Sequence, residues 1–134
     1  MKKITTLLLI ILVFISCSND GEDTLLLDSS SLVGTYEWIV TQGGSGYIYN
    51  TPDNSNSTGS LTITSNTVTF IFNGEVTIQG NYHLEVKNSD LLNEAMSAMV
   101  LDNGTYYLID YDENSIILIE DVPNGFSYGY VKLL

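Results

Sequence analysis

Nucleophilic catalysis would need an activated serine or cysteine beside a base, and this chain offers few such residues. It contains one histidine, His83, and one cysteine, Cys17. A catalytic triad needs a nucleophile, a base and a group that orients the base. His83 lies between Tyr82 and Leu84 in an alternating segment, so we expect an outward polar side chain there. The sequence therefore predicts no catalytic residue, no enzymatic activity and no cofactor.

Carboxylates are the most numerous groups that could do chemistry. Asp110, Asp112 and Glu113 crowd one turn, and Glu120 with Asp121 ends a strand. Paired carboxylates can hydrolyse glycosides or bind calcium. The spacing fits no calcium loop, and one histidine with one cysteine forms no zinc cluster. We interpret both groups as solvated turn residues and predict no metal site.

Aromatic side chains are the best candidates for binding a ligand. Phe126, Tyr128 and Tyr130 form a stripe with a period of two, and tyrosine combines an apolar ring with a polar tip that can orient a ligand. Tyr47 and Tyr49 lie in a long loop, residues 42–59, which we predict to form a mouth or lid. The full set of candidate ligand-binding residues is Tyr36, Trp38, Tyr47, Tyr49, Tyr106, Phe126, Tyr128 and Tyr130. The alternative is that these aromatics fill a solid core.

The first sixteen residues have the layout of a secretory signal peptide. Met1–Lys3 is basic, and the uninterrupted apolar run Leu7–Ile15 has nine residues, about half of what a membrane-spanning helix needs. The segment Phe14–Cys17 resembles a bacterial lipoprotein box, in which a small residue precedes the lipid-accepting cysteine. The resemblance implies cleavage after residue 16, lipidation of Cys17 by fatty acids such as palmitate, and a membrane anchor of acyl chains.

Residues 17–31 are interpreted as the lipidated cysteine and a flexible acidic tether. Asp20, Glu22 and Asp23 follow the cysteine closely, which resembles the export signal of surface-displayed lipoproteins of the Bacteroidota. The next residue, Thr24, lies in a segment that resembles an O-glycosylation acceptor of the same bacteria. These resemblances imply an outer-membrane lipoprotein exposed at the cell surface. The alternative is that the acidic run is only a solvated spacer.

The charge balance excludes several partners. Against 16 Asp and Glu the chain has four Lys and no Arg, and two of those lysines fall in the leader. A surface of this sign repels phosphate, so we expect no nucleic-acid partner and no docking onto anionic membranes by charge. A lone cysteine also allows no internal disulfide, so the core must stabilise the fold by itself.

From Leu32 onward the dominant hydrophobic period is two, which indicates strands with one buried face. The expected strands cover residues 32–41, 61–64, 67–72, 76–86, 97–101, 105–110, 115–120 and 126–133. Asn73-Gly74 predicts a type I′ hairpin, and Gly80 predicts a bulge. Residues 87–90 are expected to form a loop, and residues 91–96 a short turn or a helix capped by Asp90.

Eight short strands joined by tight turns predict an all-β, antiparallel up-and-down barrel over residues 32–134. Along the first strand, alternation places Tyr36 and Trp38 inside and Thr41 outside. Closure removes exposed sheet edges. A barrel of eight strands is either filled by its own side chains or just wide enough for a small ligand.

Four segments carry a family resemblance: Gly34–Trp38, Asn73–Glu75, Gly80–Tyr82 and Asn124–Lys132. They resemble the lipocalin-like domain of small Bacteroidota lipoproteins, and the similarity covers most of the chain from residue 32. Lipocalins carry a tryptophan two residues after the first glycine; here a tyrosine holds that position and Trp38 lies two residues further on. The resemblance implies a barrel that binds a small apolar or amphipathic ligand, or a protein partner of unknown identity. The alternative is a structural or interaction lipoprotein with a solid core and no ligand.

Overall fold

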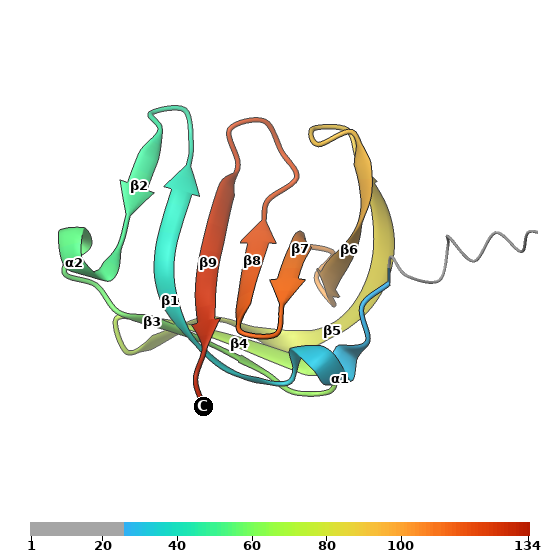
Figure 1. Cartoon of the computed structure of the whole chain (residues 1–134), viewed down its shortest axis with the longest axis horizontal. Coiled ribbons are helices and arrows are strands. Elements are labelled where there is room, and N and C mark those ends of the chain that lie inside the picture. The colour runs from blue at the N-terminus through green and yellow to red at the C-terminus, as the bar shows by residue number, and fades with distance from the viewer. Residues whose placement is uncertain (1–25) are drawn as a thin grey trace, which may run out of the picture.

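The computed structural model describes residues 26–134 of the 134-residue chain, and these residues form an all-β domain with two short helices (Figure 1). The predicted signal peptide, the predicted lipidation site at Cys17, the acidic residues Asp20, Glu22 and Asp23, and Thr24 lie outside the described residues.

The domain is a closed antiparallel barrel. In chain order its elements are α1 (Ser29–Leu32), β1 (Gly34–Gly43), β2 (Ile48–Asn50), α2 (Pro52–Ser55), β3 (Gly59–Ile63), β4 (Thr67–Phe72), β5 (Glu75–Ser89), β6 (Glu94–Leu101), β7 (Tyr106–Asp112), β8 (Ser115–Ile119) and β9 (Phe126–Lys132). Neighbours along the chain pair with each other from β3 to β9, β1 pairs with β3, and the pairing of β9 with β1 closes the ring. The predicted eight-stranded up-and-down barrel is therefore confirmed, with β2 as an added short strand.

β1 contains a bulge that the sequence analysis missed. The register against β9 shifts between Trp38 and Val40, which makes Ile39 an extra residue. A β-bulge of this kind disturbs the alternation of side chains beyond it. Thr41 therefore faces inward, and its Oγ1 accepts a hydrogen bond of 2.9 Å from Trp38 Nε1. The prediction that Thr41 faces outward was wrong, because it assumed strict alternation.

The β4–β5 hairpin has the predicted turn but a different bulge. Asn73 and Gly74 have φ of 50° and 82°, as a type I′ turn requires. Gly80 pairs in regular register with Val68, so the predicted bulge at Gly80 was wrong. The extra residue of β5 is Thr77, whose hydroxyl donates to the Phe70 carbonyl at 3.3 Å.

β5 carries the barrel around a corner. Its residues 75–81 pair with β4 and its residues 82–89 pair with β6, without overlap. The predicted loop at residues 87–90 was mostly wrong, because Lys87–Ser89 continues the ladder with β6. Residues 90–93 form a turn and no helix, and β6 begins at Glu94 instead of Ser97.

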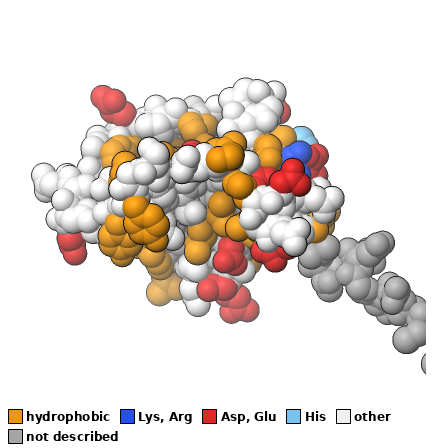
Figure 2. All heavy atoms as spheres, turned by 90° about the horizontal axis from the view of Figure 1, so that it is seen from above, with side chains coloured by type: hydrophobic (Ala, Val, Ile, Leu, Met, Phe, Trp, Pro, Cys, Tyr) orange, Lys and Arg blue, Asp and Glu red, His pale blue; other side chains and the backbone are white. Residues whose placement is uncertain are grey.

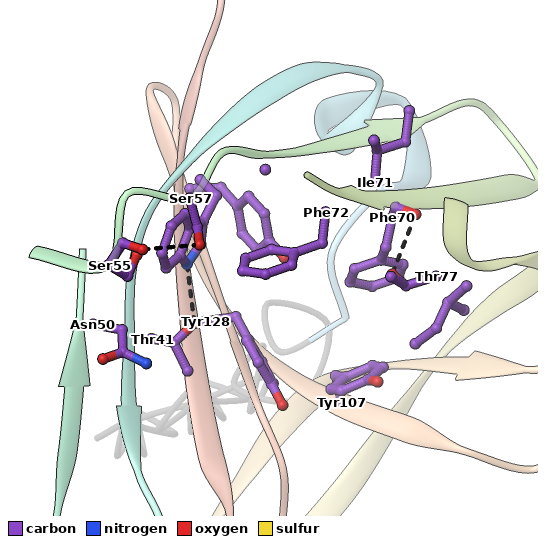
Figure 3. Close-up of a pocket in the computed structure, with 14 residues that line it drawn as sticks. Thr41, Asn50, Ser55, Ser57, Phe70, Ile71, Phe72, Thr77, Tyr107 and Tyr128 are labelled. Atoms are coloured by element: carbon purple, nitrogen blue, oxygen red, sulfur yellow. Dashed lines mark hydrogen bonds between the residues drawn. The ribbon is translucent and has the colours of Figure 1, made fainter. Parts of the chain in front are cut away.

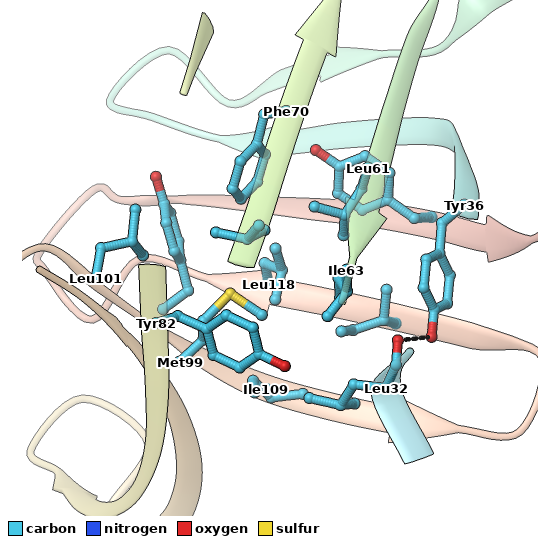
Figure 4. Packing of buried hydrophobic residues seen from close by; sticks show 14 of the residues in the cluster. Leu32, Tyr36, Leu61, Ile63, Phe70, Tyr82, Met99, Leu101, Ile109 and Leu118 are labelled. Atoms are coloured by element: carbon cyan, nitrogen blue, oxygen red, sulfur yellow. Dashed lines mark hydrogen bonds between the residues drawn. The ribbon is translucent and has the colours of Figure 1, made fainter. Parts of the chain in front are cut away.

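One end of the barrel is filled by side chains, and α1 lies across it (Figure 1). Leu32 is fully buried, and its carbonyl accepts a hydrogen bond of 2.7 Å from the Tyr36 hydroxyl. We had predicted that Leu32 begins the first strand, and this was wrong, because Leu32 is the last residue of α1 and β1 begins at Gly34. Figure 4 shows Leu32 packed among buried side chains that include Ile63, Ile109 and Leu118. We call this part the closed end.

Residues 42–59, predicted to form a long loop, are mostly structured. They contain β2, which pairs with the last residues of β1, and α2. The helix begins with a capping box: Asn54 N donates to Thr51 Oγ1 at 3.4 Å, and Thr51 N donates to Asn54 Oδ1 at 2.8 Å. This reciprocal pair fixes the start of the helix. β2 and α2 together stand beside the barrel, on the left in Figure 1.

Candidate functional site

The other half of the barrel is hollow. It contains a cavity of about 520 Å³, a volume within the range of small-molecule sites. The walls come from β1, β4, β5, β7 and β9 and from the segment that holds β2 and α2. The lining residues are Trp38, Thr41, Asn50, Ser55, Ser57, Gly59, Phe70, Ile71, Phe72, Thr77, Ile78, Tyr107, Tyr128 and Tyr130. The interior is thus filled at the closed end and empty beside it.

Aromatic rings dominate the walls. Figure 3 shows Phe70 and Phe72 of β4 on one side of the cavity and Tyr107 and Tyr128 on the other. The Tyr107 ring lies 5.8 Å from that of Phe70 and 6.3 Å from that of Tyr128, and Trp38 packs edge-on against Phe72 at 5.5 Å. Such contacts stabilise the rings against each other. They hold the apolar walls in place around the remaining space.

A polar strip borders the cavity on the side of β2 and α2. Ser55 Oγ donates to the Thr51 carbonyl at 2.7 Å, and Ser57 Oγ donates to the Ser55 carbonyl at 3.3 Å. Asn50 lines the same side and is exposed. The strip makes one rim of the cavity hydrophilic, opposite the aromatic walls (Figure 3).

Two tyrosines of the cavity wall carry hydroxyl groups that no other described residue uses. Tyr107 and Tyr130 both line the cavity, and both side chains are 6% exposed. Neither hydroxyl has a hydrogen-bond partner among residues 26–134. Every fully buried side-chain nitrogen or oxygen of these residues has a hydrogen-bond partner. The two hydroxyl oxygens are therefore not fully buried and reach open space. Burial raises the pKa of each hydroxyl, so both stay protonated at neutral pH. They can donate to or accept from a bound molecule.

A carboxylate lies directly behind the wall. The Tyr128 hydroxyl donates to Glu120 Oε1 at 2.7 Å, and Glu120 Oε2 accepts a hydrogen bond of 2.9 Å from Phe126 N. Burial, followed by the bond to Glu120, raises the pKa of the Tyr128 hydroxyl. Glu120 is half-buried and held by two bonds. Its fixed position differs from the solvated turn residue that we had expected.

Asp121, the next residue, contacts a different part of the barrel. It accepts a hydrogen bond of 2.6 Å from Ser89 Oγ and one of 3.1 Å from the Tyr106 hydroxyl. The Lys87 ammonium lies 4.7 Å from the centre of the Tyr106 ring. Tyr106 therefore faces away from the cavity, whereas Tyr107, its neighbour on the other face of β7, lines it.

The sequence-predicted aromatic residues fall into three groups. Trp38, Tyr128 and Tyr130 line the cavity, and Phe126 contacts Tyr128 at 6.3 Å without lining it. Tyr36 is fully buried at the closed end, and Tyr106 lies outside the cavity. Tyr47, just before β2, and Tyr49, on β2, are 84% and 58% exposed and do not line the cavity. Its mouth is bordered by Asn50, Ser55 and Ser57 instead.

Sequence reasoning missed several cavity residues, Tyr107 and Phe72 among them. Phe70 and Phe72 alternate with other residues within the predicted strand 67–72, but nothing in the sequence pattern shows which strands face each other across the interior. Tyr107 was passed over because the adjacent Tyr106 has the same side chain. Adjacent residues of a strand face opposite sides, and the closed barrel, in which Tyr107 pairs with the buried Met99 of β6, shows that Tyr107 is the one facing inward.

The remaining polar clusters are on the surface. His83 Nε2 lies 3.3 Å from Glu85 Oε2, with the His83 side chain 61% exposed, as predicted. Lys87 Nζ lies 2.6 Å from the other oxygen of Glu85 and, with His83, lowers the pKa of that carboxyl. Figure 2 shows a histidine and basic side-chain atoms beside acidic side chains at one edge of the molecule. An exposed pair of this kind stabilises the fold little.

Within residues 26–134, no group of three His, Cys, Asp or Glu is placed to hold a metal ion. In the same segment no helix has the length and apolar character needed to cross a membrane. Comparisons of the chain with protein-family models, with curated proteins and with solved structures found no match.

Proposed function

We propose that this protein is a surface-exposed lipoprotein of the outer membrane whose barrel binds a small apolar or amphipathic molecule. The observation that carries the binding proposal is the aromatic cavity of about 520 Å³ with two partnerless tyrosine hydroxyls. Small-molecule sites combine mostly apolar walls with a few placed polar groups. The resemblance to the lipocalin-like domain of small lipoproteins supports the same function.

The alternative, a structural lipoprotein with a solid core, fits only part of the interior. Protein interiors pack about as densely as organic crystals, and side chains beside empty space lose contacts. The closed end follows this rule, with Leu32 and Ile63 at 0% and 1% exposure. The cavity departs from it, because six aromatic rings surround space that larger side chains could fill. A binding function explains why this space is not filled by side chains.

The proposed anchor rests on the lipoprotein box at Cys17 and on the acidic residues that follow it. The described chain begins at Leu26, on the side of the barrel opposite α2 (Figure 1), and Leu27 N is fixed there by a 2.9 Å bond to Ser97 Oγ. A tether that enters at this point would leave the polar rim of the cavity uncovered and open to ligands.

Titration with the fluorescent apolar probe N-phenylnaphthylamine tests the binding proposal. We expect saturable binding at one site, weakened by Tyr128→Ala without unfolding, because this ring forms part of the wall. Tyr49→Ala is the matched control, since Tyr49 is 58% exposed and lies outside the cavity. No saturable binding, or equal weakening by both substitutions, would leave the solid structural barrel as the better account.

A further inference from the structure

The cavity wall carries no cation. None of its lining residues is Lys, Arg or His. The two lysines of residues 26–134 are placed elsewhere: Lys87 pairs with Glu85, and the Lys132 ammonium lies 5.7 Å from the centre of the Tyr36 ring at the closed end. A ligand carboxylate or phosphate would therefore leave water without a positive partner, which costs free energy.

The wall is instead biased towards positive ligands. Glu120 lies one hydrogen bond behind Tyr128, so its charge acts on the cavity through a phenol that already donates its proton. A phenol bonded in this way is a stronger acceptor for a second donor. The charge of Glu120 also helps to raise the pKa of the Tyr107 hydroxyl, after burial as the main cause. The Tyr128 oxygen thus becomes the stronger hydrogen-bond acceptor of the wall.

The faces of the aromatic rings also favour a positively charged ligand. The negative face of an aromatic ring attracts an ammonium or amine group, and the attraction grows when the group is desolvated. Phe70 and Phe72 lie on one side of the cavity and Tyr107 and Tyr128 on the other (Figure 3), and Trp38 packs edge-on against Phe72. The whole chain has a net charge of −12, which draws cations towards it over longer distances.

We infer that the cavity takes an organic amine or ammonium compound with an apolar body and discriminates against fatty acids and other carboxylates. The amine would donate to the hydroxyl oxygen of Tyr128, which is bonded to Glu120, and the apolar body would lie against Phe70 and Phe72. This inference rests on the proposed ligand-binding function and adds the chemical class of the ligand.

Three compounds that share one body and differ in head group test the inference on the purified protein. Phenylbutylamine, phenylbutanol and phenylbutyrate are each used to displace N-phenylnaphthylamine, followed also through the fluorescence of Trp38, the single tryptophan. We expect the amine to bind about tenfold more tightly than the alcohol, a ratio within the range of a partly desolvated cation–π contact. The carboxylate should bind most weakly.

Glu120→Gln shows whether the preference comes from this carboxylate. The amide can still accept from Tyr128, so we expect the amine to lose several-fold in affinity while the alcohol is unchanged. Glu113→Gln removes the same charge from an exposed turn at the closed end and should change neither. The comparison of head groups on the unsubstituted protein does not depend on whether this variant folds.

The outcomes separate the two proposals. If the probe binds and all three compounds displace it equally, or the carboxylate displaces it best, the inference is wrong and the ligand-binding function stands. If the probe and all three compounds fail to bind, the ligand-binding function fails and the inference fails with it. If the amine binds most tightly, then the alcohol, then the carboxylate, and only Glu120→Gln reduces the preference for the amine, both the ligand-binding function and the inference are supported.

Discussion

Two isoleucines allow the filled and hollow halves of the barrel to be compared directly. Ile63 of β3 is 1% exposed in the closed end, whereas Ile78 of β5 is half-buried and lines the cavity. Replacing either residue with alanine removes the same carbon atoms from the same kind of strand. Any difference in the free energy of unfolding then reports on the surroundings of the side chain.

The surroundings predict unequal losses. Ile63→Ala should cost about 3–4 kcal/mol, because about 0.8 kcal/mol is lost per buried methylene and a new void adds a further term. At Ile78 the side chain is only partly buried and the new space would join a cavity that already exists. Without a new void, Ile78→Ala should cost about 1–2 kcal/mol.

Guanidinium unfolding, followed by circular dichroism and by Trp38 fluorescence, measures both losses. The dependence of the unfolding free energy on denaturant concentration should be the same in both variants and the parent protein, which shows that the comparison is valid. A loss of about 3 kcal/mol or more at Ile78, equal to that at Ile63, would mean that the cavity is closed by packing in solution. The interpretation that this half of the barrel is hollow would then be refuted.

Three further outcomes are expected. Cys17→Ala should abolish acylation and release the protein from membranes, which fractionation and palmitate labelling would measure; retention in the outer membrane would count against the lipoprotein box. Replacing Asp20, Glu22 and Asp23 together with alanine should leave acylation intact but remove the protein from protease-accessible surface, and unchanged accessibility would reduce the run to a spacer. Burial, followed by nearby tyrosines, raises the pKa of Tyr36 to about 12. The protonated Tyr36 hydroxyl therefore stabilises the fold fully below about pH 10. This stabilisation is lost between about pH 10 and 12, because in this range Tyr36 ionises in the unfolded chain but not in the folded one. Urea unfolding across this range should show a shallower decline for Tyr36→Phe; an identical decline would contradict the assignment.

Strand positions were largely predictable from the sequence because each depends on local alternation. The hairpin at Asn73-Gly74 was predictable for a similar reason, since few residue pairs accept positive φ twice. The bulges at Ile39 and Thr77 were not, because they arise from how two strands fit together around a closed ring. The wrong bulge at Gly80 shows that glycine alone does not locate one.

The candidate site was predicted only in part, because a cavity depends on strands that are distant in sequence. Trp38, Tyr128 and Tyr130 were identified from their alternation on two strands that lie side by side. The opposite wall, with Phe70 and Phe72, could be recognised only once the barrel was closed. Glu120 required the contact with Tyr128, which no sequence pattern encodes.

Nuclear magnetic resonance titration of the protein with N-phenylnaphthylamine tests the central claim most directly. The single tryptophan gives one indole resonance, from Trp38 Nε1, which lies in the cavity wall. We expect this resonance and the backbone amide resonances of Phe72 and Ile78 to shift saturably, while the backbone amide resonance of Leu32 at the closed end stays unchanged. Shifts that do not saturate, or that gather at the exposed Tyr49, would contradict a binding cavity inside the barrel.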